Sequence, residues 1–324
     1  MRLSLAALLS CLALPAAAEL PVLTVMTYDS FNSEWGPGPF VEVAFEDLCG
    51  CDLRFVSGGD GAALLARLQL EGASSDVDVV LGLDTNLTAQ AAASGLFAPH
   101  GQPAAAALPI TFDDPLFLPY DWGWFAFNHD RGLLPEPPRS FEALAASDLK
   151  IVIQDPRSST PGLGLLMWVK AAYGDRAPEI WAALSDNILT VTPGWSESYG
   201  LFLEGEADMV LSYTTSPAYH RIAEADDSKD WAPFDEGHYL QVEVSGILAG
   251  SDQTDLARAF LAFTQDHAFQ SVLPETNWMY PASPVELSEG FETARPEISL
   301  LLSADEAAAI RAGALAEWQA ALAR

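Results

Sequence analysis

The chain has 324 residues, half of them hydrophobic and a tenth aromatic, which excludes a disordered or collagen-like chain. With 45 Asp and Glu against 15 Lys and Arg, its formal net charge is −30. So acidic a surface repels phosphates and therefore disfavours nucleic-acid binding and binding to anionic membranes. The acidity favours either plain solubility or a field that attracts a cationic ligand, and both interpretations stay open.

The first 18 residues have the pattern of a secretory signal. Arg2 is followed by an apolar stretch over residues 3–14 and by small residues up to Ala18. The stretch is too short to span a bilayer. We therefore predict a signal peptide over residues 1–18 and an exported mature chain that begins near Glu19.

The mature chain keeps two cysteines, Cys49 and Cys51, separated by one residue. An oxidising compartment favours a disulfide, although a bridge across one residue is strained and easily reduced. A structural zinc site needs about four ligands, and the five histidines are scattered along the chain. We predict no metal.

Strands and helices alternate along the chain. Strands are expected at Val22–Thr27, Leu53–Val56, Val77–Leu83, Trp122–Asn128, Lys150–Gln154, Ile188–Thr192, Asp208–Tyr213 and Tyr239–Leu248. Helices are expected at Pro39–Leu48, Ala62–Glu71, after residues 84–86, at Gly162–Tyr173, Ser196–Glu204 and Asp255–Ala268, and from Ser303, where Glu306 completes a capping box. This alternation predicts an α/β protein with parallel sheets.

The mature chain is too long for one ordinary core, so we predict two lobes. Lobe 1 comprises 19–118 and 245–324, and lobe 2 comprises 119–244. The chain crosses between them near Phe117–Tyr120 and again near Gly237–Val244. Ligands of open parallel sheets bind beyond the carboxyl ends of the strands, which places the site in the cleft between the lobes.

Aromatic residues concentrate in the loops that follow the predicted strands. Each one alone is readily explained by packing at a half-buried position. Several together at strand ends favour a stacking cage for a flat or cationic group, at roughly 0.5–2 kcal/mol per ring. The candidates are Tyr28, Trp35, Trp195, Tyr213, Tyr219 and Trp278.

Small polar residues open helices in the same loops. Ser159 and Thr160 precede a proline in the first helical turn, and Asp60-Gly61 and Ser196 open two further helices. Helix N-termini offer free N–H donors and partial positive charge to a phosphate or carboxylate, and plain capping is the alternative. A ligand with a flat cationic half and an anionic tail suits both sets of loops.

At these loops the sequence resembles the periplasmic thiamine-binding proteins of bacterial ABC importers, along nearly the whole mature chain. The resemblance rests on residues 27–31, 35–39, 49–51, 78–84, 154–157, 159–165, 194–197, 211–220, 236–244 and 277–281. It implies a two-lobed periplasmic-binding-protein fold of the α/β class, with parallel-rich sheets flanked by helices. It also implies capture of thiamine, thiamine monophosphate or thiamine diphosphate, and delivery to a membrane permease driven by a cytoplasmic ATPase. We expect a periplasmic monomer without a cofactor.

The resemblance also implies which residues bind the ligand. The family's binding positions correspond here to Asp60, Gly61, Ser159, Thr160, Trp195, Tyr213, Thr214, Thr215, Ser216 and Pro217, and its cage positions to Tyr28, Trp35, Tyr219 and Trp278. The chain departs from the family just before Asp60, at residues 57–59, a change that bears on how the ligand's tail is held.

Two alternatives remain. The fold is also similar to that of thiaminases, which cleave thiamine with a cysteine nucleophile, but Cys49 and Cys51 precede a strand and so lie away from the cleft. Another cationic solute would keep the fold and change the ligand. A polyamine needs several cleft carboxylates, and ferric iron needs clustered tyrosines, of which the sequence has no adjacent pair. We predict a binding protein and no enzyme.

Overall fold

The computed structural model describes residues 20–103, 105–291 and 295–323, so the predicted signal peptide and the start near Glu19 lie outside the described residues. The strands are β1 (Val22–Thr27), β2 (Asp52–Ser57), β3 (Val79–Asp84), β4 (Phe97–Ala98), β5 (Phe117–Asp130), β6 (Ile151–Gln154), β7 (Ile188–Thr192), β8 (Met209–Tyr213), β9 (Lys229–Trp231), β10 (His238–Leu248), β11 (Tyr280–Pro281) and β12 (Ser299–Leu300). The helices are α1 (Gly38–Cys49), α2 (Gly61–Glu71), α3 (Thr88–Ala93), α4 (Phe141–Ala145), α5 (Thr160–Tyr173), α6 (Ala177–Leu184), α7 (Trp195–Leu203), α8 (Ser216–Ala223), α9 (Thr254–Phe263), α10 (His267–Gln270), α11 (Leu273–Thr276) and α12 (Ala304–Leu322).

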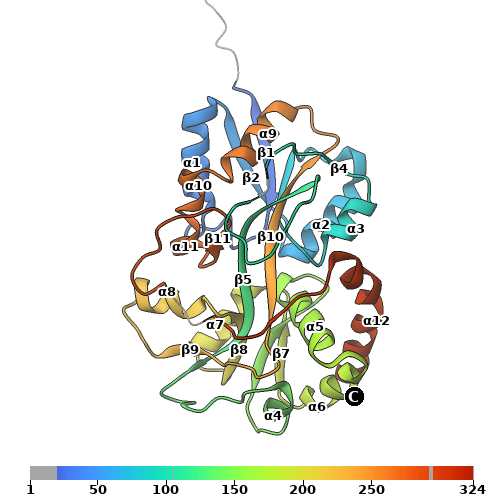
Figure 1. Cartoon of the computed structure of the whole chain (residues 1–324), viewed down its shortest axis with the longest axis vertical. Coiled ribbons are helices and arrows are strands. Elements are labelled where there is room, and N and C mark those ends of the chain that lie inside the picture. Colours follow the sequence, from blue (N-terminus) through green and yellow to red (C-terminus); the bar gives the residue numbers. More distant parts are fainter. Residues whose placement is uncertain (1–19, 104, 292–294, 324) are drawn as a thin grey trace, which may run out of the picture.

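The strands join in the order β2-β1-β3-β10-β5-β8-β6-β7, and β5 and β10 run along the long axis of the molecule (Figure 1). At one end β1 pairs in parallel with β2 and β3, and at the other β6 pairs in parallel with β7 and β8. The two long central strands, β5 and β10, run antiparallel to each other and to their outer neighbours. The predicted α/β class is confirmed, with a parallel unit at each end and two antiparallel strands joining them.

The two central strands are longer than predicted, and their pairing contains a bulge. Phe117–Asp130 forms one strand, whereas the sequence prediction began it at Trp122, because Pro119 interrupts the local pattern. The ladder between β5 and β10 shifts register between Glu243 and Val244, so that Val244 faces Pro119 and Tyr120 is left over as a bulge. Proline is tolerated in a sheet at such a bulge, and a bulge redirects the side chains around it.

Two further elements refine the prediction at the C-terminal end of the chain. The expected helix over Asp255–Ala268 is wrong as a single helix: α9 ends at Phe263 and α10 begins at His267. The Thr264 hydroxyl donates to the Leu261 carbonyl, which favours a helix end there. The capping box of Ser303 and Glu306 is confirmed. Helix α12 contacts α5, α6 and α3, so it bridges the two ends of the molecule, and the predicted lobe boundaries stay a prediction.

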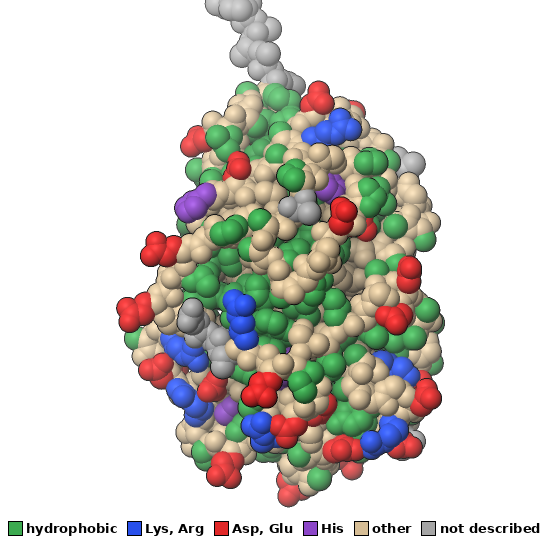
Figure 2. Space-filling model, in the orientation of Figure 1, with side chains coloured by type: hydrophobic (Ala, Val, Ile, Leu, Met, Phe, Trp, Pro, Cys, Tyr) green, Lys and Arg blue, Asp and Glu red, His purple; other side chains and the backbone are tan. Residues whose placement is uncertain are grey.

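Apolar packing is dense at both ends. Strand β3 is buried along its whole length, and Trp168 and Trp181 are fully buried beneath the helices of the other end. On the face drawn in Figure 2, apolar side chains gather in the middle, and most Lys and Arg lie on the lower half. No helix among the described residues is long and apolar enough to cross a membrane.

The cysteines lie at the end of β2 that is remote from the carboxyl ends of the strands. Cys49 ends α1, Cys51 directly precedes β2, and the two form a disulfide, as an oxidising compartment favours. The opposite end of β2 leads through residues 58–60 into α2, where the candidate site begins.

Candidate functional site

A cavity of about 490 Å³ lies at the carboxyl ends of the parallel strands, between the two ends of the molecule. The predicted residues that line it are Tyr28, Trp35, Asp60, Thr160, Trp195, Tyr213, Ser216, Tyr219 and Trp278. The remaining predicted residues are buried and are adjacent in sequence to lining residues. They are Gly61, Ser159, Thr214, Thr215 and Pro217. Sequence reasoning missed other lining residues, among them Tyr199, Glu243, Asn277 and Met279.

The first wall of the cavity, here called the polar wall, is built from the N-termini of α2, α5 and α7. The Asp60 carboxylate accepts a hydrogen bond of 2.7 Å from the Gly61 N–H at the start of α2. The Ala63 N–H on α2 donates to the carbonyl of Ser158, just before α5, at 3.0 Å. A Cβ on Gly61 would lie 1.8 Å from Thr160 Oγ1. Only a glycine therefore lets α2 approach α5 this closely.

Hydrogen-bonding capacity is left over at the polar wall. Ser159 Oγ and Thr160 Oγ1 are buried, and neither lies at ordinary hydrogen-bond distance from a partner among the residues that the structure describes. The N-cap residues Ser159 and Gly194 do not cap α5 and α7 with their own side chains. A buried hydroxyl without a partner costs about 1–3 kcal/mol, so this wall is suited to a ligand rich in oxygen atoms. Burial raises the pKa of Asp60, and the Ser159 side chain and neighbouring backbone N–H groups partly oppose that shift.

The second wall is aromatic. The rings of Trp195 and Tyr199 stack with their centroids 4.9 Å apart, and Trp35 lies 6.4 Å from Trp195. Tyr219 and Trp278 meet edge to face at 5.4 Å. Trp278 has a φ of 56°, a left-handed conformation that is rare for a bulky residue and is often associated with a functional site.

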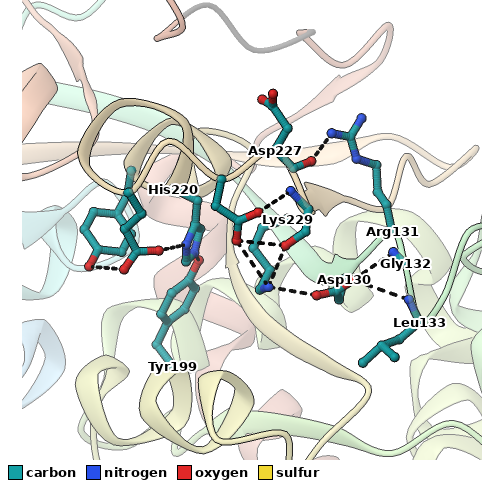
Figure 3. Close-up of polar contacts among 12 residues, drawn as sticks. Asp130, Arg131, Gly132, Leu133, Tyr199, His220, Asp227 and Lys229 are labelled. Atoms are coloured by element: carbon teal, nitrogen blue, oxygen red, sulfur yellow. Dashed lines mark hydrogen bonds and ion pairs between the residues drawn. The ribbon is translucent and has the colours of Figure 1, made fainter.

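A hydrogen-bonded network behind the aromatic wall fixes two of its rings (Figure 3). The Tyr199 hydroxyl lies 2.9 Å from His220 Nε2, and His220 Nδ1 lies 2.7 Å from the Glu224 carboxylate. The Tyr219 hydroxyl donates to the same carboxylate, at 2.9 Å. His220 is 1% exposed. This chain of bonds holds Tyr199 and Tyr219 from behind, and sequence reasoning missed it because the histidine read as a scattered polar residue.

The same network includes a candidate metal-binding group. One ligand atom each from His220, Glu224 and Asp226 lies within 4.8 Å of the others. However, both ring nitrogens of His220 already have hydrogen-bond partners, and Asp226 accepts from Ser228 and lies 3.7 Å from Lys229. A metal ion would have to displace these contacts, so we assign the cluster to positioning.

The floor of the cavity is acidic. Glu243 on β10 and Asp121 on β5 face each other in the ladder. Tyr28 donates to Glu243 at 2.9 Å, and Tyr120 donates to the same oxygen. Asn277 donates to Asp121 at 2.7 Å. The sequence offered no signal for the burial of Glu243, because an alternating strand is expected to expose its polar face, whereas β10 is buried along its whole length.

Burial raises the pKa of both acids on the floor. The charge of Glu243 raises the pKa of Asp121 further, and the charges of Asp60 and Asp84 raise that of Glu243, because like charges repel. The pKa of Glu243 rises to about 7, opposed by its hydrogen bonds from Tyr120 and Tyr28. A cavity with aromatic sides, an acidic floor and an oxygen-binding wall can hold a flat cation with a polar tail.

Comparison with known proteins identifies the family. The family model for bacterial extracellular solute-binding proteins matches residues 36–270. The thiamine-binding periplasmic protein of Escherichia coli (strain K12) is 51% identical over 321 residues, covering 98% of each chain. A solved periplasmic thiamin binding protein superposes with a TM-score of 0.93 at 49% identity, over 95% of this chain and 98% of that chain. The chain belongs to the bacterial extracellular solute-binding protein family.

More distant structures show how widely this fold is used. The ferric binding protein from Campylobacter jejuni superposes on this solute-binding protein with a TM-score of 0.75, over 92% of this chain and 99% of that chain. Because its sequence identity is 17%, the likeness shows the fold alone. The predicted two-lobed fold and the resemblance to the thiamine-binding relatives are both confirmed.

The relatives are binding proteins, and the position of the thiols fits that class. A thiol nucleophile needs a neighbouring base inside the site. Cys49 and Cys51 are bonded to each other at the far end of β2. Neither is among the described residues that line the cavity.

Proposed function

We propose that this protein binds thiamine and its mono- and diphosphates in the periplasm and delivers them to the membrane permease of an ABC importer. The observation that carries the proposal is the combination of three surfaces in one cavity: the aromatic wall, the acidic floor and the unsatisfied polar wall. The names of its relatives at about half identity support the same ligand. The volume of the cavity lies within the range of small-molecule sites.

Each part of thiamine matches one surface of the cavity. The thiazolium ring is permanently cationic and the aminopyrimidine is flat, so both suit the rings of Trp195, Tyr219 and Trp278. Glu243 supplies negative charge near the cation. The hydroxyethyl or phosphate tail suits Ser159, Thr160 and the N–H groups that open α5 and α7.

The protein's net charge acts differently on the three ligands. Its negative field attracts free thiamine and repels the diphosphate. The local donors of the polar wall must therefore outweigh the long-range field when a phosphate is bound. We propose binding without turnover by a monomer that needs no cofactor.

Four measurements test the function. Mass spectrometry of the protein as purified from the periplasm should detect a co-purified thiamine species, and N-terminal sequencing of the same material should begin near residue 19. Calorimetry should show binding of thiamine, thiamine monophosphate and thiamine diphosphate. Binding of a polyamine or ferric iron in place of all three would overturn the assignment. Cleaved pyrimidine and thiazole after incubation with thiamine and a nucleophile would show an enzyme.

A further inference from the structure

We propose that Asp121 and Glu243 share one proton in the ligand-free protein and release it when the cation of thiamine enters the cavity. This inference rests on the proposed function and adds that binding is coupled to proton release. It assigns the charge specificity of the site to two side chains that neither the sequence analysis nor the family resemblance singled out.

The geometry places the two carboxyl groups in direct opposition. Residues paired across an antiparallel ladder have neighbouring side chains, and Asp121 pairs with Glu243 directly beside the bulge at Tyr120. Asp121 is 0% exposed and Glu243 is 5% exposed. Two ionised carboxylates this close and this buried repel strongly, so at neutral pH one proton stays with the pair.

The groups that surround the pair do not neutralise it. Tyr28, Tyr120 and Gln241 donate hydrogen bonds to Glu243, and each is uncharged at neutral pH. Among the described residues no Lys, Arg or His forms an ion pair with Asp121 or Glu243. The charged groups that act on the pKa of Glu243 are two further acids, Asp60 at the start of α2 and Asp84 on β3. Tyr213 from β8 also faces the pair.

Of the two acids, Glu243 lines the cavity and Asp121 is fully buried. Asp121 Oδ1 and Gln241 Oε1 are buried without hydrogen-bond partners in the described part of the chain. A buried acceptor without a donor is costly. A permanent cation beside the pair stabilises its doubly ionised form more than its singly protonated form, because the former carries the larger negative charge. The proton then leaves to solvent, and the pair binds the cation with its full charge.

The direction of the pH dependence follows from this coupling. Burial and the repulsion of neighbouring carboxylates raise the pKa values of both acids in the free protein, and a cation bound beside them lowers these pKa values. Below the raised pKa, binding releases a proton and affinity increases with pH. Above it, the pair is already ionised, so release fades and affinity levels off.

The experiment is calorimetry of the full chain with unphosphorylated thiamine at pH 6.5 and pH 8.5, in two buffers of different ionisation enthalpy. Thiamine is used because its phosphates titrate in this range. We expect release of more than half a proton per thiamine at pH 6.5, a smaller fraction at pH 8.5, and affinity about threefold or more tighter at pH 8.5. Thiamine binding without proton release would overturn the inference and leave the proposed function intact. Failure of thiamine to bind at either pH would overturn both.

Two variants locate the proton. The double variant Glu243→Gln/Asp121→Asn replaces both carboxyl groups by amides of the same shape and removes their repulsion, so it should fold. Because its floor has no titratable carboxyl group, it should bind thiamine with the same affinity at both pH values, release less than a fifth of the wild-type proton, and bind more weakly than wild type at pH 8.5. Asp78→Asn removes a buried acid that bonds Thr24 and Ser251 at the other end of β3, and it should keep the wild-type release. Undiminished release in the double variant would assign the proton to Asp60 or Asp84 and overturn the inference.

Discussion

The two walls of the cavity are organised in opposite ways. The polar wall consists of backbone N-termini and short side chains, and its hydroxyl groups lack partners in the described structure. The aromatic wall consists of large side chains that are already fixed, with Tyr199 and Tyr219 bonded to His220 and Glu224 from behind. The polar wall has hydrogen-bonding groups that a ligand can use, whereas the tyrosines of the aromatic wall already have hydrogen-bond partners within the protein.

This difference has an energetic consequence. A ligand gains at the polar wall by supplying hydrogen bonds that the protein leaves unmade, so that wall distinguishes ligands by their tails. At the aromatic wall the gain comes from surface area and from attraction between the cation and the rings, which are already in place. Rings held in advance lose little side-chain freedom on binding. We therefore expect the polar wall to determine the preference among thiamine and its phosphates. The aromatic wall should contribute the part of the affinity that all three ligands share, here called the common affinity.

Removing the two hydroxyls of the polar wall should have the largest effect on phosphorylated ligands. Each lost hydrogen bond to a charged group costs roughly 1.5–3 kcal/mol, so the double variant Ser159→Ala/Thr160→Ala should lose about 3 kcal/mol or more toward thiamine monophosphate. The loss of binding free energy toward thiamine should be clearly smaller. Calorimetry with both ligands measures the difference, and equal losses would show that the two hydroxyls do not hold the tail.

Blocking the approach of the two lobes should weaken all three ligands together. In Gly61→Ala the new Cβ meets Thr160 Oγ1 at 1.8 Å and the Gly82 carbonyl at 2.9 Å, so α2 must move away from α5. We expect about 100-fold weaker binding, or about 2.7 kcal/mol. Gly313→Ala on α12 is the control, since a Cβ there meets no neighbouring atom. Unchanged affinity in Gly61→Ala would mean that this contact is unnecessary for binding.

Truncating the aromatic wall tests its share of the common affinity. Trp278→Ala should cost roughly 1–3 kcal/mol for thiamine and for its phosphates alike, since it removes both cation attraction and apolar contact. Titrations followed by intrinsic fluorescence measure the loss. Trp181→Phe, a buried change in α6 outside the cavity, should lower the melting temperature and leave affinity unchanged. A folded Trp278→Ala protein with wild-type affinity would identify this ring as packing only.

Local signals in the sequence were sufficient for much of this arrangement. Alternating buried strands and helix caps located both parallel units and the loops at their carboxyl ends, where Asp60, Thr160, Trp195 and Trp278 are found. Proline and small polar residues at the start of α5 marked the polar wall. These features depend on neighbours in the chain, so a local pattern contains them.

The acidic floor and the network behind the rings depend on contacts between distant segments. Asp121 meets Glu243 only because β5 pairs with β10 in a register that a bulge at Tyr120 sets. Tyr199 and His220 lie on different helices, and their contact depends on how α7 and α8 pack. The break between α9 and α10 is local, but its polar residues also suit a helix surface, so hydrophobic pattern alone did not separate the two helices.

The smallest expected effect concerns how far the aromatic wall depends on being held. Glu224 lies near the surface, so Glu224→Ala should fold normally, but it removes the acceptor shared by His220 and Tyr219. Tyr219 then gains freedom that binding must remove, which should weaken thiamine and its phosphates equally by about 1 kcal/mol. Glu224→Gln can still accept from the His220 ring and donate to the Tyr219 oxygen, so it should restore most of the affinity. Glu204→Ala, at the exposed end of α7, controls for the loss of one negative charge. Calorimetry decides the case: if Glu224→Ala binds like wild type, the rings hold their places by packing alone, whereas a loss that Glu224→Gln also shows would point to the charge of Glu224 and not to its hydrogen bonds.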